Sequence, residues 1–219
     1  PHFYVGNPLQ KTPRRKCTEK ADYDALDLSE LPDDYLPRTN YVPDVDPDEY
    51  LRRTPKVPWG DKTAATGFYR INTRRRTSAA AERTLQASIM PKGTGHIDSV
   101  FSVALKATMH IPLLAGLWIS LPFDFLIKTT GKGDFRYDIA GQLPFFDSLF
   151  TPYLNLRTLM LTCLTTHYAD LWTECWNPAY TQGCWTKSDP RLPSTHFIDL
   201  TPTWHSDCAL RTDYARRQA

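Results

Sequence analysis

A cluster of arginines lies between two short apolar runs in the middle of this sequence. Residues 67–90 contain five arginines, and a turn with two glycines follows directly. The flanking runs at 68–73 and 84–90 predict β-strands, since apolar and polar residues alternate in them. The arginine guanidinium donates two parallel hydrogen bonds, which suits phosphate groups and guanine edges. This part of the chain therefore predicts two strands whose cationic connection faces solvent or a polyanion.

Charge is distributed unevenly along the chain, although the formal net charge of its 219 residues is only +2. Residues 21–50 contain ten acidic residues and one basic residue, whereas residues 51–92 contain ten basic and two acidic ones. A basic middle beside an acidic flank fits a nucleic-acid surface with a repelling border. The alternative interpretation is that the acidic and basic segments form two solvated surfaces of the protein that attract each other.

Proline is concentrated in residues 1–66, which hold nine of the 18 prolines. Proline keeps the backbone extended or turning, so we expect this segment to wrap around a folded core. Because the chain begins with proline and ends within a helical pattern, we expect it to be a piece of a longer protein. The apolar anchors of the wrapping segment would be Tyr23, Leu26, Leu28, Leu31, Tyr35, Leu36 and Tyr41.

Hydrophobic spacing predicts the remaining elements. A third strand is expected at 100–106 and a buried helix at 111–126, which the sequence TTGKG ends. A strand at 143–146 is expected to enter the core. Residues 149–176 repeat apolar positions every three or four residues, which predicts one long packing helix. A tryptophan-containing loop and the start of a last helix at 210–217 complete a mixed α+β fold.

Cysteine usage and hydropathy restrict the class of protein. The five cysteines include no Cys-x-x-Cys pair, which argues against a disulfide framework and a zinc ribbon and favours a reducing cytoplasm. The longest apolar run, at 111–127, is interrupted by two prolines and Asp124, so we expect no membrane span. The candidate metal ligands are Cys175, Cys184, His196, His205 and Cys208. These residues lack the closely spaced ligand pairs of zinc sites, so no metal site is expected.

Three sequence blocks follow one another in a recognisable order: ERTLQASIMPKGTGHIDSVFSVAL at 82–105, LLAGLWISLPFDFLIKTTGKGDFRYDIAGQLPFF at 113–146, and LRTDYARR at 210–217. Together they resemble the C-terminal target-recognition region of large adenine-specific DNA methyltransferases, including type IIG restriction-modification enzymes and related phage-defence methylases. The resemblance covers residues 68–219 well and 1–66 more loosely. It implies a mixed α/β (α+β) target-recognition fold whose strands and loops enter the DNA groove.

The resemblance also implies an organisation and partners. Residues 1–66 would form the wrapping segment, and 67–148 the DNA target-recognition core, with a small mixed sheet and one buried helix. Residues 149–219 would contribute the long packing helix, the tryptophan-rich loop and the start of a C-terminal helix. The partners would be double-stranded DNA and the catalytic methyltransferase domain of the same parent chain. S-adenosylmethionine would be bound by that catalytic domain, and no cofactor is expected in these residues.

The sequence lacks the motifs that methyl transfer requires. An adenine methyltransferase needs a glycine-rich turn for S-adenosylmethionine and an Asn/Asp-Pro-Pro-aromatic tetrapeptide for the flipped adenine, and neither occurs. The acidic run that could supply the carboxylates of a nuclease centre is Asp44, Asp46, Asp48 and Glu49. No lysine follows this run at the spacing of a strand, so a nuclease centre is not expected. The run is predicted to form a solvated loop. We therefore expect that this chain by itself is not an enzyme.

The residues expected to contact DNA surround the arginine cluster and two glycine-containing turns, where basic side chains and backbone amides can approach phosphate. They are Arg70, Arg74, Arg75, Arg76, Arg83, Lys92, Thr94, His96, Lys128, Thr130, Lys132 and Arg136. Each group has a second explanation. The basic residues at 70–76 would be ordinary surface charge, and Arg83 would pair with Glu82. The residues at 92–96 would form a tight turn, and those at 128–136 would end a helix.

Two classes of function remain. The sequence favours double-stranded DNA recognition by the specificity module of a larger N6-adenine DNA methyltransferase or restriction-modification enzyme. The alternative is a non-catalytic protein-interaction or scaffold domain whose tryptophans and long helix form an interface. Salt dependence separates the two, because phosphate contacts release counterions and apolar contacts do not.

Overall fold

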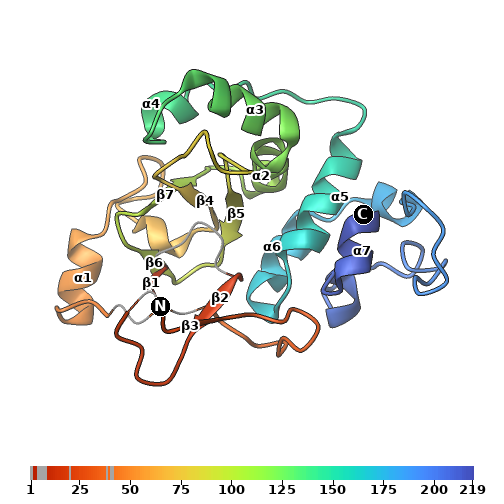
Figure 1. Cartoon of the computed structure of the whole chain (residues 1–219), viewed down its shortest axis with the longest axis horizontal. Helices are drawn as coiled ribbons and strands as arrows, with labels where there is room; N and C mark the ends of the chain where they lie inside the picture. Colours follow the sequence, from red (N-terminus) through yellow and green to blue (C-terminus); the bar gives the residue numbers. More distant parts are fainter. Residues whose placement is uncertain (1, 4–8, 20, 38, 40–41) are drawn as a thin grey trace.

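The computed structural model describes residues 2–3, 9–19, 21–37, 39 and 42–219. Seven α-helices accompany a three-stranded and a two-stranded antiparallel sheet within this part of the chain, which confirms the predicted mixed α+β class (Figure 1). The two-stranded antiparallel sheet consists of β2 (Lys11–Pro13) and β3 (Tyr23–Ala25). The shorter α-helices are α1 (Pro47–Arg53), α4 (Tyr137–Ala140), α6 (Ala169–Glu174) and α7 (Asp213–Gln218). The 3-10 helices are η1 (Ala65–Gly67), η2 (Thr108–His110), η3 (Thr166–Tyr168), η4 (Pro178–Gln182) and η5 (Ser206–Cys208).

The main sheet has the strand order β5-β4-β7, with β4 (Arg70–Arg74) in its centre and β5 (Ala87–Met90) and β7 (Val100–Ala104) at its edges. All its strand pairs are antiparallel, so the expectation of a mixed sheet is wrong here. A parallel pair occurs separately, between β1 (His2–Phe3) and β6 (Gly95–His96). The three strands predicted in this region are confirmed, with shifted ends.

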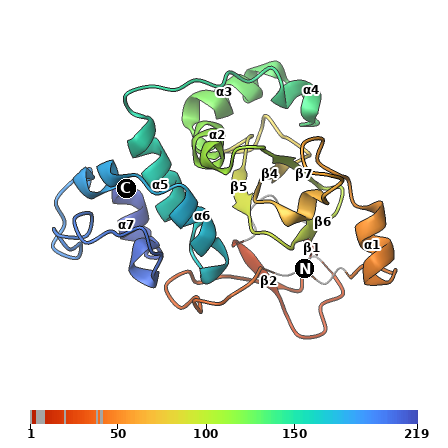
Figure 2. The same cartoon turned by 180° about the vertical axis from the view of Figure 1, so that it is seen from behind.

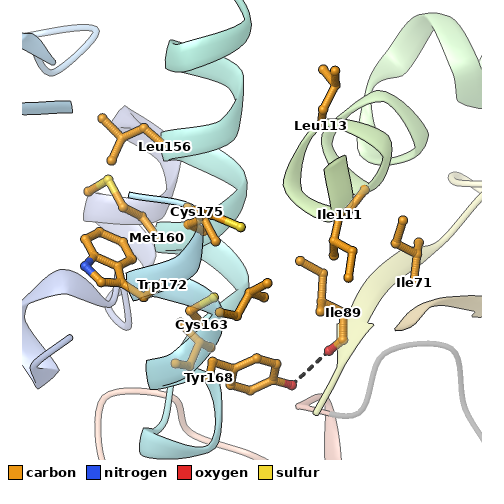
Figure 3. Close-up of a cluster of buried hydrophobic side chains, with 14 of the residues drawn as sticks. Ile71, Ile89, Ile111, Leu113, Leu156, Met160, Cys163, Tyr168, Trp172 and Cys175 are labelled. Carbon is orange, nitrogen blue, oxygen red and sulfur yellow. Dashed lines mark hydrogen bonds between the residues drawn. The ribbon is translucent and has the colours of Figure 1, made fainter. Parts of the chain in front are cut away.

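Helix α2 (Ile111–Ile119) lies between the main sheet and α5 (Thr151–Thr162), as the views from both sides show (Figure 1, Figure 2). Ile111 of α2 lies next to Ile71 and Ile89 of the sheet (Figure 3). Seven of the nine α2 residues are buried, because the helix is covered on two sides. One hydrophobic cluster continues from this layer into the N-terminal and C-terminal segments, so the segments share a core.

The single buried helix predicted for 111–126 is wrong, because the chain breaks at Ser120. This residue has an extended backbone with ψ of 152°, and α3 (Leu121–Thr130) starts after it. The two helical segments are bent by 63° at the break. In a continuous helix, the ring of Pro122 would clash with the carbonyl group of Trp118, four residues earlier. Proline in the first turn of a new helix avoids that clash.

The long helix predicted for 149–176 is also wrong as one element. Helix α5 ends at Thr162, and α6 begins only after the 3-10 turn η3. The C-terminal segment enters at this break, where Trp204 Nε1 donates a hydrogen bond of 2.9 Å to the Cys163 carbonyl group. A distant part of the chain thus satisfies a carbonyl group at the end of α5, and no local pattern encodes that contact.

Residues of the proline-rich segment contribute to the hydrophobic core in the described part of the chain. Leu9 and Leu31 belong to the buried hydrophobic cluster. Arg211 near the C-terminus donates to the Leu31 carbonyl group and forms an ion pair of 2.7 Å with Asp33. The expected anchor Tyr41 lies outside the described residues. Contacts between the two ends of the chain therefore close the fold.

We expect Tyr168→Phe to lower the free energy of unfolding by about 1–2 kcal/mol. The buried Tyr168 hydroxyl donates to the Ile89 carbonyl group at 2.9 Å, which joins η3 to the edge strand β5 (Figure 3). The substitution leaves that carbonyl group without its donor. Urea denaturation measures the change, with Tyr153→Phe on the exposed face of α5 as the matched control. Equal stability of the two variants would show that the hydrogen bond contributes nothing.

Candidate nucleic-acid interface

Two cationic segments that are far apart in the sequence lie side by side in the structure. The Phe135 amide donates to the Arg75 carbonyl group at 2.7 Å, and the Thr77 amide donates to the Gly133 carbonyl group at 3.2 Å. We call residues 74–77 and 131–136 the cationic loop pair. One loop continues from β4 and the other follows α3, so rigid elements support both of them. The structure brings together basic residues that the sequence identified separately.

Asp134 lies in the centre of the cationic loop pair and compensates part of its charge. Its carboxylate accepts a hydrogen bond of 2.9 Å from Arg136 and lies 3.6 Å from Arg75 and 3.7 Å from Arg76. The hydrogen bond from Arg136, with the neighbouring arginine charges, lowers the pKa of Asp134. Arg75 also pairs with Asp98 at 2.9 Å, and its side chain is only 12% exposed. Arg75 is therefore a structural residue of the pair rather than an open DNA contact.

Four cations of the loop pair remain accessible. Arg74 and Lys132 are exposed, and among the described residues neither has an acidic partner within 4.0 Å. Arg76 is 68% exposed and shares Asp134 with Arg136, which is also exposed. Because one carboxylate cannot neutralise all these groups, the loop pair presents net positive charge to solvent.

The residues before Lys132 end helix α3, which was the second explanation offered for this loop. Gly131 takes the left-handed backbone conformation at φ of 64° that typically stops a helix. Thr130 Oγ1 donates to the Ile127 carbonyl group at 2.7 Å, and Lys128 Nζ donates to the Ala81 carbonyl group at 2.9 Å. Thr130 and Lys128 thus serve local structure, and their predicted DNA contacts are not supported.

Arg83 stabilises the connection between β4 and β5 instead of facing DNA. It donates to the Ile119 carbonyl group at the end of α2, and its Nε lies 3.5 Å from the buried carboxylate of Asp124. That carboxylate also accepts hydrogen bonds of 2.7 Å from the Thr84 and Leu85 amides. The structural partner of Arg83 is Asp124, whereas the sequence offered a pair with Glu82 as the alternative to a DNA contact. The sequence showed Asp124 only as an interruption of an apolar run.

Two of the residues predicted to contact DNA have buried side chains. Arg70 is only 4% exposed and donates to the Thr94 carbonyl group, while Thr94 is fully buried and donates through Oγ1 to the Pro91 carbonyl group at 2.7 Å. Arg70 lies on the central strand β4, where it pairs with Met90 of β5 and Ala104 of β7. Neither side chain is part of the exposed surface of the cationic loop pair.

The turn at 92–96 also differs from the expected phosphate cradle. The Gly93 amide already donates to the Thr66 carbonyl group at 2.8 Å, and its φ of 75° is that of a tight turn. Lys92 Nζ lies 3.8 Å from Asp170 and 3.7 Å from Glu174. His96 Nε2 lies 2.8 Å from Ser102 Oγ. Local partners therefore occupy the side chains of Lys92 and His96.

An exposed apolar surface was missed in the sequence. Residues 143–146 form no strand, and Phe145 and Phe146 are half exposed rather than inserted in the core. Leu149 and Phe150 are 91% and 74% exposed. We use the term apolar face for the exposed large apolar residues of α3, α4 and the connection to α5, which are Leu121, Phe125, Tyr137, Phe145, Phe146, Leu149 and Phe150. The i, i+4 spacing of Leu121 and Phe125 opposite buried Phe123 and Ile127 was the available signal.

The acidic run forms a helix start instead of the predicted loop. Asp46 Oδ1 accepts hydrogen bonds of 3.1 and 3.0 Å from the amides of Asp48 and Glu49, which begins α1. Glu49 pairs in turn with Arg52 at 2.6 Å. Within the described residues, no group of three or more histidine, cysteine or acidic side chains lies close enough to hold a metal ion. All five cysteines have free thiols.

Comparison of the chain with protein-family models, with curated proteins and with solved structures finds no match. In the described part of the chain, no individual helix has both the length and the apolar character to cross a membrane. The bent pair formed by residues 108–119 and 121–130 meets those criteria only when its two helices are taken together.

We expect Asp124→Ala to lower the free energy of unfolding by about 3–5 kcal/mol, because it leaves two backbone amides and Arg83 without their shared acceptor. Chemical denaturation measures this loss. Asp138→Ala, on the exposed surface of α4, is the control and should change stability by less than about 0.5 kcal/mol. A small effect of Asp124→Ala would mean that Asp124 does not hold this connection.

Proposed function

We propose that the chain recognises double-stranded DNA as the specificity module of a larger N6-adenine DNA methyltransferase or restriction-modification enzyme. The observation that carries the proposal is the cationic loop pair, in which two basic segments are hydrogen-bonded to each other. One segment continues from β4 and the other follows α3. The resemblance of the sequence blocks to target-recognition regions supports the same reading. A cytoplasmic location is part of this proposal, since the DNA substrate of such an enzyme lies there.

The four accessible cations would divide two tasks in the proposed complex. Arg76 and Arg136 share Asp134, which fixes their guanidinium groups and suits contacts to the phosphate backbone. Arg74 and Lys132 have no acidic partner among the described residues and would be free to reach base edges. Methyl transfer, with S-adenosylmethionine, would belong to the catalytic domain of the parent chain.

The apolar face fits the second partner in this proposal. Its residues lie on α3, α4 and the connection to α5, outside the cationic loop pair. An exposed group of large apolar side chains is typical of a surface that another protein covers. The catalytic methyltransferase domain of the parent chain would cover it.

We expect the double variant Arg76→Ala/Arg136→Ala, which removes the two proposed phosphate contacts, to weaken duplex binding about tenfold or more at low salt. It should also reduce the slope of log affinity against log salt by about 2, one unit for each lost phosphate contact. Fluorescence anisotropy with a labelled duplex over a salt series measures both quantities. Arg191→Ala, which removes an exposed arginine outside the loop pair, is the control. Absence of duplex binding by the unmodified chain at low salt would refute the proposal.

A protein-interaction or scaffold domain is the second candidate, and the apolar face is the observation that favours it. In that case the chain would bind a protein partner with little dependence on salt, because the contacts would be apolar. Charge removal in the cationic loop pair would leave that affinity unchanged. The salt series described above therefore separates the two functions.

A further inference from the structure

A pocket distinct from the cationic loop pair opens on the other side of strand β7. It has a volume of about 610 Å³ and lies between β6, β7 and the segment that follows α1. Arg70 is among its lining residues, together with Tyr50, His96, Phe101 and Ser102. The size of the pocket is in the range of sites for small organic ligands.

Arg70 carries a positive charge inside this pocket without a counterion. Among the described residues, no carboxylate lies within 4.0 Å of its guanidinium group. Its Nη2 donates to the Thr94 carbonyl group, whereas its buried Nε has no hydrogen-bond partner. Burial lowers the pKa of Arg70 to about 10, so the group stays charged at neutral pH. A buried charge with unused donors is costly unless an anion compensates it.

The other charged groups of the pocket do not compensate Arg70. Asp98 also lines the pocket, but its carboxylate pairs with Arg75 at 2.9 Å and is largely exposed. Arg53 adds a further positive charge to the lining and pairs with Glu49 of its own helix. Electrostatics in the pocket therefore favours an anion next to Arg70.

The rest of the lining indicates what kind of anion fits. Pro55, Val100 and Ala104 provide apolar walls, and Tyr50 adds an aromatic ring. His96 and Ser102, which lie 2.8 Å apart, provide polar groups beside Arg70. A guanidinium group with donors in one plane matches the oxygens of phosphate. The volume exceeds that of inorganic phosphate and leaves room for a ring.

We propose that this pocket binds a phosphate-bearing ligand of mononucleotide size, with the phosphate at Arg70 and the ring against the apolar wall. The phosphate can come from a free nucleotide or from a nucleotide of a DNA strand. The proposal does not depend on duplex recognition by the cationic loop pair, because different side chains carry it.

Thermal unfolding of the full chain with AMP and with inorganic phosphate, at constant ionic strength, tests the site. A ligand at about ten times its Kd should raise Tm by about 3–6 °C. Arg70→Met replaces the charged side chain by an unbranched apolar one. In this variant the rise in Tm should disappear while the protein still folds. Arg14→Met, at an exposed arginine outside the pocket, should keep the rise in Tm.

A second variant keeps Arg70 and fills the pocket. Ala104 pairs with Arg70 across the sheet and lines the pocket, so Ala104→Leu should also abolish the rise in Tm with AMP. This variant decides the question if Arg70→Met does not fold. No rise in Tm with either ligand in the unmodified chain, or an equal rise in all variants, would overturn the proposal.

Competition identifies the source of the phosphate. If a DNA duplex displaces AMP and Arg70→Met weakens duplex binding, the ligand is a nucleotide of the strand. If AMP and duplex bind independently, the ligand is a free nucleotide. Both outcomes support the site. Loss of AMP binding with intact duplex binding in Arg70→Met leaves the proposed function standing. A rise in Tm with AMP that depends on Arg70, in a chain that binds no duplex at low salt, leaves the pocket standing and refutes the proposed function.

Discussion

The structure depends on the burial of helix α2 between the main sheet and α5. Gly116 permits the close approach of the two helices, because a Cβ atom there would lie 2.4 Å from Thr158 Oγ1. On the sheet side, Ile111 of α2 packs against Ile71 and Ile89 (Figure 3). Strand β4 and helix α3, which support the two loops of the cationic pair, both adjoin α2. Apolar packing thus places the two loops, and backbone hydrogen bonds and the carboxylate of Asp134 then hold the cationic segments together against the repulsion between their charges.

Charge compensation then decides which cations remain available. Asp134 and Asp98 occupy Arg75, and Asp124 occupies Arg83. Arg70 has no such partner, although it is the most deeply buried of these arginines. The same residue type therefore has three states in one small region: exposed and free, paired, and buried without a counterion. A buried guanidinium without a counterion is the least stable of the three, and for this reason the anion site is proposed at Arg70.

Local patterns predicted the type of most elements but not their ends or breaks. The three strands of the main sheet follow from alternation, and Gly131 ends α3 as glycine commonly does. The break at Ser120 was readable from Pro122, whose ring cannot continue the preceding helix. The break after α5 was not readable, because the hydrogen bond from Trp204 to Cys163 joins residues that are 41 positions apart. Helical periodicity continues across that break and therefore predicted a single helix.

The sequence by itself determined the mixed α+β class, the strands around the arginine cluster and the presence of basic residues in two separate loops. Only the tertiary structure decided which of those residues meet. It placed residues 74–77 beside 131–136, buried Arg70 and Thr94, and left the apolar face open. The physical reason is that strand and helix propensities act over a few residues, whereas burial and ion pairing depend on contacts between distant segments.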